Sequence, residues 1–149
     1  MAELTRQDVI KLVAVGRRPI CLRGVDLSGL DLSYLDLSEA DLSHANLEKA
    51  NLAHAWLHKA GLFKANLTEA NLTGVLLRCA ELVGANLTNA DLSQADLNQA
   101  TLCGATLLGT NLTKSTCEGG NFDGVQANTA TIWPDTFEQC HFDLAIESD

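Results

Sequence analysis

The sequence predicts an all-β solenoid with a short helix at its N-terminal end, and a strict repeat carries that prediction. Nineteen consecutive leucines stand at every fifth position from Leu22 to Leu112. A period of five fits neither ordinary element. On a helix five residues advance by about 500°, which spreads the leucines around every face, and on a strand alternate leucines would point to opposite sides. All can face one interior only if the chain turns a corner in every repeat, so we expect a coil wound around a leucine core.

The residues around each leucine repeat as well, most clearly in residues 40–44, 45–49 and 65–69. Ala mostly stands two positions before the leucine, Asp or Asn stands one before, and Ser or Thr often follows. Ala beside Leu supplies a small and a large side chain that can interdigitate in a narrow core. Asp, Asn, Ser and Thr bond nearby backbone groups in turns, so we expect these polar positions to be structural.

This unit resembles the pentapeptide-repeat family, whose consensus is A(D/N)LXX, over residues 20–144. The resemblance implies a right-handed quadrilateral β-helix with four repeats per coil and with Leu and the preceding Ala pointing inward. About twenty-five repeats make about six coils, a rod on the order of 30 Å long at the spacing of paired strands. After Leu112 the beat is expected to continue at Cys117, Phe122, Ala127, Ile132, Phe137 and Phe142.

Residues 1–19 precede the repeats and are expected to form a helix over 5–15 with a lead-in to the first coil. Thr5 followed by Asp8 resembles a helix start with an acidic first turn, and Pro19 lies beyond its end. A stack of coils exposes an apolar cross-section and unpaired strand groups at each end. We therefore expect the helix to lie over the first coil as a cap.

Large residues replace the leucines towards the other end, at Ile132, Trp133, Phe137 and Phe142. They are expected to close the core, and a homodimer through this end is the alternative. Residues 145–149 are expected to form an acidic tail.

Composition excludes a membrane protein and predicts a cytoplasmic one. The chain is 46% hydrophobic but only 5% aromatic, which fits a narrow core of small, uniform side chains. No apolar run reaches the length of a membrane-spanning helix, and the first residues lack the pattern of a signal peptide.

No motif predicts an enzyme, a cofactor or a metal. The sequence lacks a Gly-rich phosphate loop, a P-loop lysine and a nucleophile elbow. His54 and His58 have a metal-ligand spacing for a helix, but they occupy different repeat slots and no further ligand accompanies them. The aspartates recur at one structural slot, which offers none of them the distinctive environment that a catalytic acid needs.

The net charge of −9 leaves one alternative function open. Some members of the family imitate DNA and occupy the DNA groove of type II topoisomerases such as gyrase. A duplex presents charge along its length, which requires an acidic column at twenty-residue spacing. Asp26, Asp31, Asp36 and Asp41 instead fall on four successive faces. Direct binding to nucleic acid is disfavoured further by the acidic surface.

Four outer positions break the polar pattern while the leucines continue. Trp56 and Leu76 occupy the Asp/Asn slot one coil apart, and Phe63 and Val83 occupy the Ser/Thr slot on the neighbouring face. We expect them to meet at one corner as an apolar patch that docks a protein partner, because exposed aromatics near Arg are typical of binding sites. Mutual support of side chains along the rod is the alternative. The patch is bordered by His58, Lys59, Lys64 and Arg78.

Overall fold

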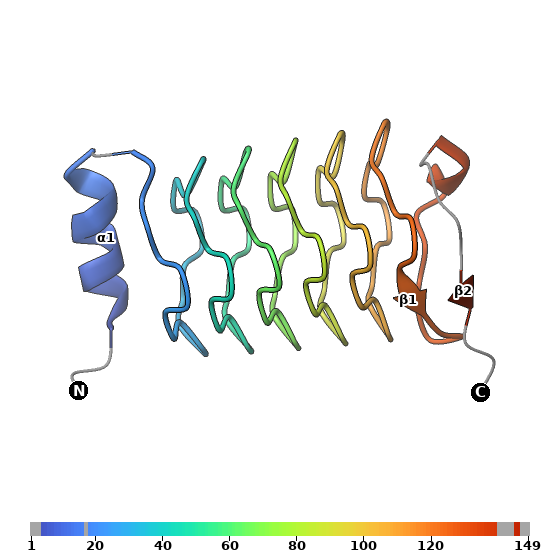
Figure 1. The fold of residues 1–149 in the computed structure, drawn as a ribbon, viewed down its shortest axis with the longest axis horizontal. Coiled ribbons are helices and arrows are strands. Elements are labelled where there is room, and N and C mark those ends of the chain that lie inside the picture. Colours follow the sequence, from blue (N-terminus) through green and yellow to red (C-terminus); the bar gives the residue numbers. More distant parts are fainter. Residues whose placement is uncertain (1–3, 17, 140–144, 147–149) are drawn as a thin grey trace.

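The chain winds into a rod of stacked coils, with helix α1 (Arg6–Ala14) across one end (Figure 1). The computed structural model describes residues 4–16, 18–139 and 145–146. Outward residues twenty positions apart form parallel bridges, beginning with Cys21 and Asp41 and continuing to Thr106 and Gln126. A twenty-residue register built from a five-residue unit means four repeats per coil, which confirms the solenoid and its four sides.

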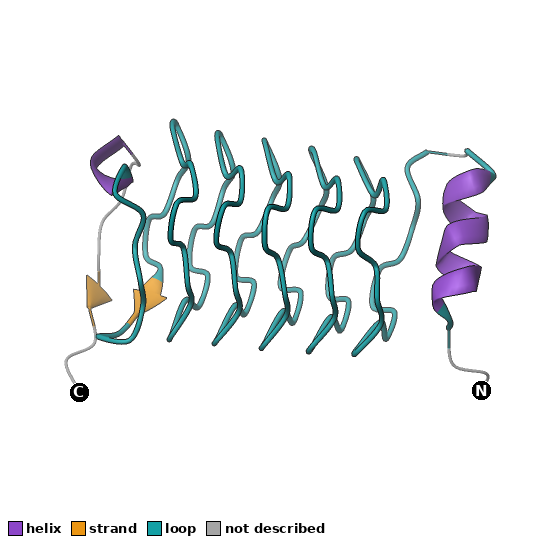
Figure 2. Ribbon diagram, turned by 180° about the vertical axis from the view of Figure 1, so that it is seen from behind, coloured by secondary structure: helices purple, strands orange, loops and turns teal. Residues whose placement is uncertain are grey.

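Regular strands are scarce because each side of a coil is too short to extend before the chain turns again. Besides α1, the described elements are β1 (Gln126–Ala127), a 3-10 helix (Phe137–Gln139) and β2 (Ala145–Ile146). β1 and β2 pair in parallel at the end opposite α1 (Figure 2). Neither helix in the described part of the chain is long and apolar enough to cross a membrane.

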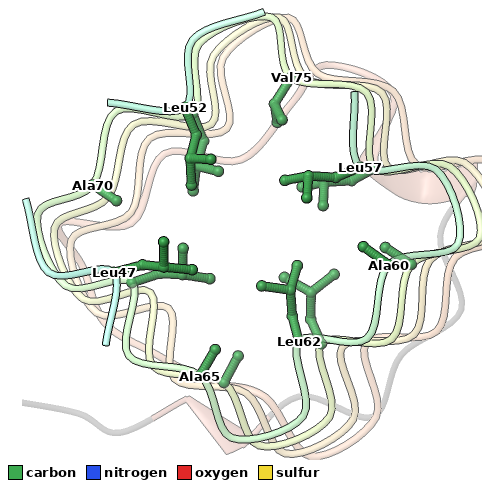
Figure 3. Packing of buried hydrophobic residues seen from close by; sticks show 14 of the residues in the cluster. Leu47, Leu52, Leu57, Ala60, Leu62, Ala65, Ala70 and Val75 are labelled. Atoms are coloured by element: carbon green, nitrogen blue, oxygen red, sulfur yellow. The ribbon is translucent and has the colours of Figure 1, made fainter. Parts of the chain in front are cut away.

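The interior consists of the leucines and the small residues two positions before them. From Leu27 to Leu107 every leucine of the five-residue repeat is 0% exposed, and the alanines two positions before these leucines are at most 1% exposed. Figure 3 looks along the rod and shows Leu47, Leu52, Leu57 and Leu62 pointing inward from the four sides. Because each coil contributes the same large and small side chains, successive coils interdigitate without large voids.

Each corner is formed by the two residues after a leucine, and the second of them adopts a left-handed backbone. Thirteen of these residues are not glycine, with φ between 52° at Lys64 and 61° at Tyr34 and Glu39. This conformation costs about 1–2 kcal/mol for a residue other than glycine. Hydrogen bonds between coils hold it in place, as when the Lys64 N–H donates to the Val83 carbonyl at 3.0 Å.

The Asp and Asn side chains of the outward slot stabilise these corners. The Oδ1 of Asp41 accepts from the Ser43 N–H at 2.9 Å, and many repeats copy this bond. Asparagine also donates along the rod, from Asn46 to Asp26 and from Asn66 to Asn46, each at 3.0 Å. An ionised aspartate can only accept, so it can begin such a ladder but cannot continue one.

Helix α1 begins one residue later and ends one residue earlier than the predicted range 5–15. Thr5 is its N-cap and forms a capping box with Asp8, which satisfies backbone N–H groups that the first helical turn leaves without partners. Val9 is 0% exposed and faces the core.

Two arginines bond the backbone edge of the first coil. Within the rod, N–H groups of each coil donate to carbonyl groups of the following coil. Among the described residues no backbone N–H from before the first coil takes this role, and the Arg6 guanidinium donates instead to the Asp31 and Ser33 carbonyls. Arg18 donates in the same way to the Ser38 carbonyl. The guanidinium groups thus take the place of backbone amides from a preceding coil.

Arg6→Ala is expected to lower the free energy of unfolding by about 1–3 kcal/mol, because the carbonyl groups lose charged hydrogen bonds. Arg6→Lys should recover only part of this, since an ammonium group lacks the planar fork of guanidinium. Urea unfolding measures both. The control is Lys11→Ala, which removes a single exposed ion pair to Asp8 (3.6 Å) and should cost less than about 1 kcal/mol. Equal losses in Arg6→Ala and Lys11→Ala would contradict the replacement role.

Hydrogen bonds lower the pKa of carboxyl groups in α1 and the first coils. The hydroxyl and the N–H of Ser33 hold the pKa of Asp31 below its ordinary value of 3.8, assisted by the Arg6 charge. The hydroxyl and the N–H of Ser28 act in the same way on the pKa of Asp26.

Acid is therefore expected to loosen the N-terminal end first. A carboxyl group with a lowered folded pKa contributes stability that is fully present above the unfolded value of 3.8, and this stability is lost as the pH falls through the folded pKa. Hydrogen exchange read by mass spectrometry, at about pH 6 and about pH 3, should show protection lost in residues 20–40 before residues 80–110. Simultaneous loss in both segments would contradict this order.

The last coil contains one extra residue, which shifts the predicted five-residue spacing by one position. Asn111 pairs with Ile132, twenty-one positions later rather than twenty. The extra residue is accommodated in a turn where the Thr131 N–H donates to the Asn128 carbonyl at 3.0 Å. The prediction that Ile132 points inward is wrong: its side chain is 53% exposed, and Trp133 follows it towards the core.

Aromatic side chains meet at this end. The rings of Phe122 and Trp133 are 6.5 Å apart, those of Phe122 and Phe137 are 6.3 Å apart, and those of Trp133 and Phe137 are 4.1 Å apart. Phe122 is 1% exposed, so these contacts extend the core beyond the last leucine. Residues 145–146, which belong to the predicted acidic tail, form β2. The prediction for Phe142 lies outside the described residues.

Candidate protein-binding surface

One side of the rod carries exposed apolar side chains, and we call it the Trp56 side. Its outward positions are joined in sequence by parallel bridges and are Asp36, Trp56, Leu76, Asp96 and Thr116. Trp56 is 54% exposed and Leu76 is 42% exposed. On the sides that begin at Asp26 and Asp31 the same slot holds only polar residues as far as Gln126. The Trp56 side is therefore an apolar interruption of a polar rod.

The residue that follows each leucine belongs to the same side as the outward residue before it. Hydroxyl groups at this slot bond the Asp or Asn Oδ1 two residues earlier, at 2.6 to 2.7 Å. His58 and Arg78 hold this slot beside Trp56 and Leu76. In two successive coils the Trp56 side thus presents Trp56 with His58 and then Leu76 with Arg78.

Phe63 and Val83 lie on the neighbouring side, so the four apolar residues do not meet at one corner. The turn at residues 58–59 stands between Trp56 and Phe63, as does the outward position of Gly61. A period of five gives the spacing of turns but not their place within the unit. The turn follows the leucine directly, which separates the slots that were expected to converge.

The surroundings of Phe63 show it supported by its neighbours along the corner. His44 meets its ring edge-on with centroids 5.4 Å apart, and the Lys64 ammonium lies 5.2 Å from the ring centroid. Phe63 is 38% exposed, less than Trp56. Stacking along the rod accounts for this part of the predicted patch.

Tyr34 and His54 border the Trp56 side on its other flank, and their contact was not predicted from the sequence. Their rings stack with centroids 5.2 Å apart, and Tyr34 is 73% exposed. The imidazole also lies over Gly74, where an added Cβ would stand 2.5 Å from Nδ1. In the sequence, Tyr34 and His54 stand twenty positions apart, and each is the second residue after a leucine, a position where residue types otherwise vary.

In the two middle coils, the charge on the Trp56 side is opposite in sign to that of the whole chain. The stacked segments 53–59 and 73–79 span this side and its two flanking corners in the middle coils, and they contain neither Asp nor Glu. Lys59 and Arg78 are their charged residues. A chain of net charge −9 therefore has a locally cationic, partly apolar surface.

Metal chemistry finds no support in this geometry. Among the residues that the structure describes, no three His, Cys, Asp or Glu side chains are close enough to hold an ion. His54 and His58 lie at two different corners, on either side of Trp56.

Comparison with known proteins identifies the repeat. The family model described as pentapeptide repeats matches in eight copies, at residues 20–58, 57–94, 65–102 and 90–125. The chain belongs to the pentapeptide-repeat family. No curated protein matches this pentapeptide-repeat sequence.

Solved pentapeptide-repeat structures resemble the chain over most of its length. Rfr23 from the cyanobacterium Cyanothece 51142 is 28% identical with a TM-score of 0.78, over 84% of this chain and 99% of that one. HetL from Nostoc sp. strain PCC 7120, involved in heterocyst differentiation regulation, is 25% identical with a TM-score of 0.55, over 95% and 78%. QnrB1, a plasmid-mediated fluoroquinolone resistance protein, is 18% identical with a TM-score of 0.40, over 83% and 76%.

Proposed function

We propose that this pentapeptide-repeat protein is a non-enzymatic, cytoplasmic scaffold or regulator that binds a protein partner through its Trp56 side. The observation that carries the proposal is the stacked pair of Trp56 and Leu76, exposed by 54% and 42% at slots that are polar on other sides. Exposed tryptophan beside arginine is typical of the residues that dominate binding energy. A regulatory role of the kind named for HetL is compatible with such a surface.

The rigidity of the rod supports this function. The outward side chains are held by a backbone whose N–H groups bond the next coil, for example Leu57 N–H to the Leu76 carbonyl at 2.8 Å. A preformed surface loses little conformational entropy when it binds, which favours affinity. Trp56 is thus presented in one fixed place relative to Leu76.

Partner capture from an extract of the native cell tests the proposal. Capture by the intact protein should be lost in the double variant Trp56→Ala with Leu76→Ala. The matched control is Phe63→Ala with Val83→Ala, which removes apolar side chains from the neighbouring side and should leave capture intact. Thermal unfolding of both variants must stay close to that of the parent. Capture that survives loss of Trp56 and Leu76 would contradict the proposal.

Imitation of DNA on a type II topoisomerase is the alternative, and the net charge of −9 is what supports it. The acidic column that contains Asp36 and Asp96 is interrupted by Trp56 and Leu76. This interruption argues against imitation of DNA, which needs a continuous column of negative charge. A gyrase supercoiling assay decides between the two functions. Absence of both inhibition and protection at micromolar protein would remove the alternative.

A further inference from the structure

We propose that the Trp56 side takes an acidic amphipathic protein segment, whose apolar side chains cover Trp56 and Leu76 and whose carboxylates lie beside Lys59 and Arg78. The inference rests on the docking role proposed above and adds the chemistry of the partner.

The apolar part of the surface is small and well defined. Trp56 and Leu76 are bridge partners in adjacent coils, which places them about 4.8 Å apart along the rod. That spacing suits one or two apolar side chains of a partner rather than a broad sheet. A short amphipathic segment matches it, with its polar residues reaching the corners.

The cations sit on one flank of this apolar strip. Arg78 follows Leu76 by two residues and Lys59 follows Trp56 by three, so both reach the same corner column of the rod. Within the described residues neither forms an ion pair, whereas Arg6, Lys11, Arg18 and Lys49 do. Two unpaired cations beside exposed apolar side chains are complementary to carboxylates that border an apolar stripe.

Carboxylates limit the surface along the rod. Glu39 lies one coil before Lys59 at the same corner, and Asp96 lies one coil after Leu76. Asp36, one coil before Trp56, is paired with Arg18. An acidic segment therefore fits only across the two middle coils, which sets its footprint.

A single-stranded nucleic acid shares the preference for aromatic and cationic groups, but the surface suits it poorly. Binding a polynucleotide relies on neutralising several phosphates in a row. Two cations within a chain of net charge −9 cannot follow such a backbone. An acidic peptide needs only the local pair.

Tryptophan fluorescence tests the proposal with defined probes. In a Trp133→Phe background Trp56 is the only tryptophan. A short synthetic peptide with leucines along one helical face and glutamates beside them should shift its emission to the blue and saturate. The same peptide with lysine in place of glutamate should not. Lys59→Glu with Arg78→Glu should weaken binding of the glutamate peptide about tenfold or more and favour the lysine peptide, because like charges that face each other across an interface oppose binding and opposite charges favour it. Lys114→Glu, exposed and two coils beyond Gly74, is the control that should change neither.

Three results would overturn the inference: no response to the glutamate peptide, equal response to both peptides, or displacement of the glutamate peptide by oligothymidylate. The outcome can be separated from that of the proposed function. If capture from the cell extract depends on Trp56 but the glutamate peptide does not bind, only the acidic chemistry is wrong. If capture does not depend on Trp56, the docking role fails as well.

Discussion

Leu77→Ala is expected to lower the free energy of unfolding by about 2–5 kcal/mol, whereas Leu76→Ala should lower it by less than about 1 kcal/mol. The two leucines are adjacent in sequence, but Leu77 is 0% exposed and Leu76 is 42% exposed. Removing Leu77 leaves a cavity between coils whose backbones are bonded on both sides. The walls of such a cavity can relax little, which places the cost towards the upper part of the range.

Urea unfolding of the two variants measures the difference directly. Comparable losses would mean that Leu76 is part of the core and that the Trp56 side is not an available surface. The pair therefore tests the fold and the candidate site together, with the same chemical change made at each position.

Phe122→Ala is expected to cost about 3–5 kcal/mol. Phe122 is among the largest fully buried side chains, and it contacts the rings of Trp133 and Phe137. Truncation removes the side chain on which the last aromatic residues pack, so the C-terminal end should lose order before the rest of the rod. In a Trp56→Phe background, Trp133 emission should shift to the red at lower urea concentration than the loss of circular dichroism.

Phe122→Leu is the matched control, because it restores the residue found at the equivalent position in the preceding coils. It should cost less than about 1.5 kcal/mol, the usual limit for an apolar exchange of similar volume. A loss as large as that of Phe122→Ala would indicate that the aromatic contacts, rather than filled volume, stabilise this end.

The interior of the rod could be predicted from the sequence because buried positions repeat the same apolar residues. Leu at every fifth position and Ala two before it occupy the slots that face inward, and the structure places them accordingly. The outer surface could be predicted only in part. Trp56 and Leu76 were expected to be exposed and stacked, and they are.

The errors have a common origin in the phase of the repeat. A strict period gives the spacing but does not say which of the five positions turns. Phe63 was therefore expected at the corner that it shares with Trp56, whereas it lies at the far end of the neighbouring side. In the last coil the leucines are gone, so the extra residue before Ile132 left no visible break in the pattern. The contact between Tyr34 and His54 was overlooked because their slot tolerates many residue types, although it joins two successive coils at the corner that borders the Trp56 side.

The twenty-residue register of the bridges separates two kinds of information in the chain. Deleting any one repeat, such as residues 65–69, would leave each inward slot filled by an equivalent residue. Every outward residue beyond the deletion, however, would rotate by a quarter turn relative to those before it, and Leu76 would leave the side of Trp56. The core depends on a residue's position modulo five, and the surface depends on its position modulo twenty. A lineage could therefore gain or lose single repeats and rewrite its binding face while its hydrophobic interior stays the same.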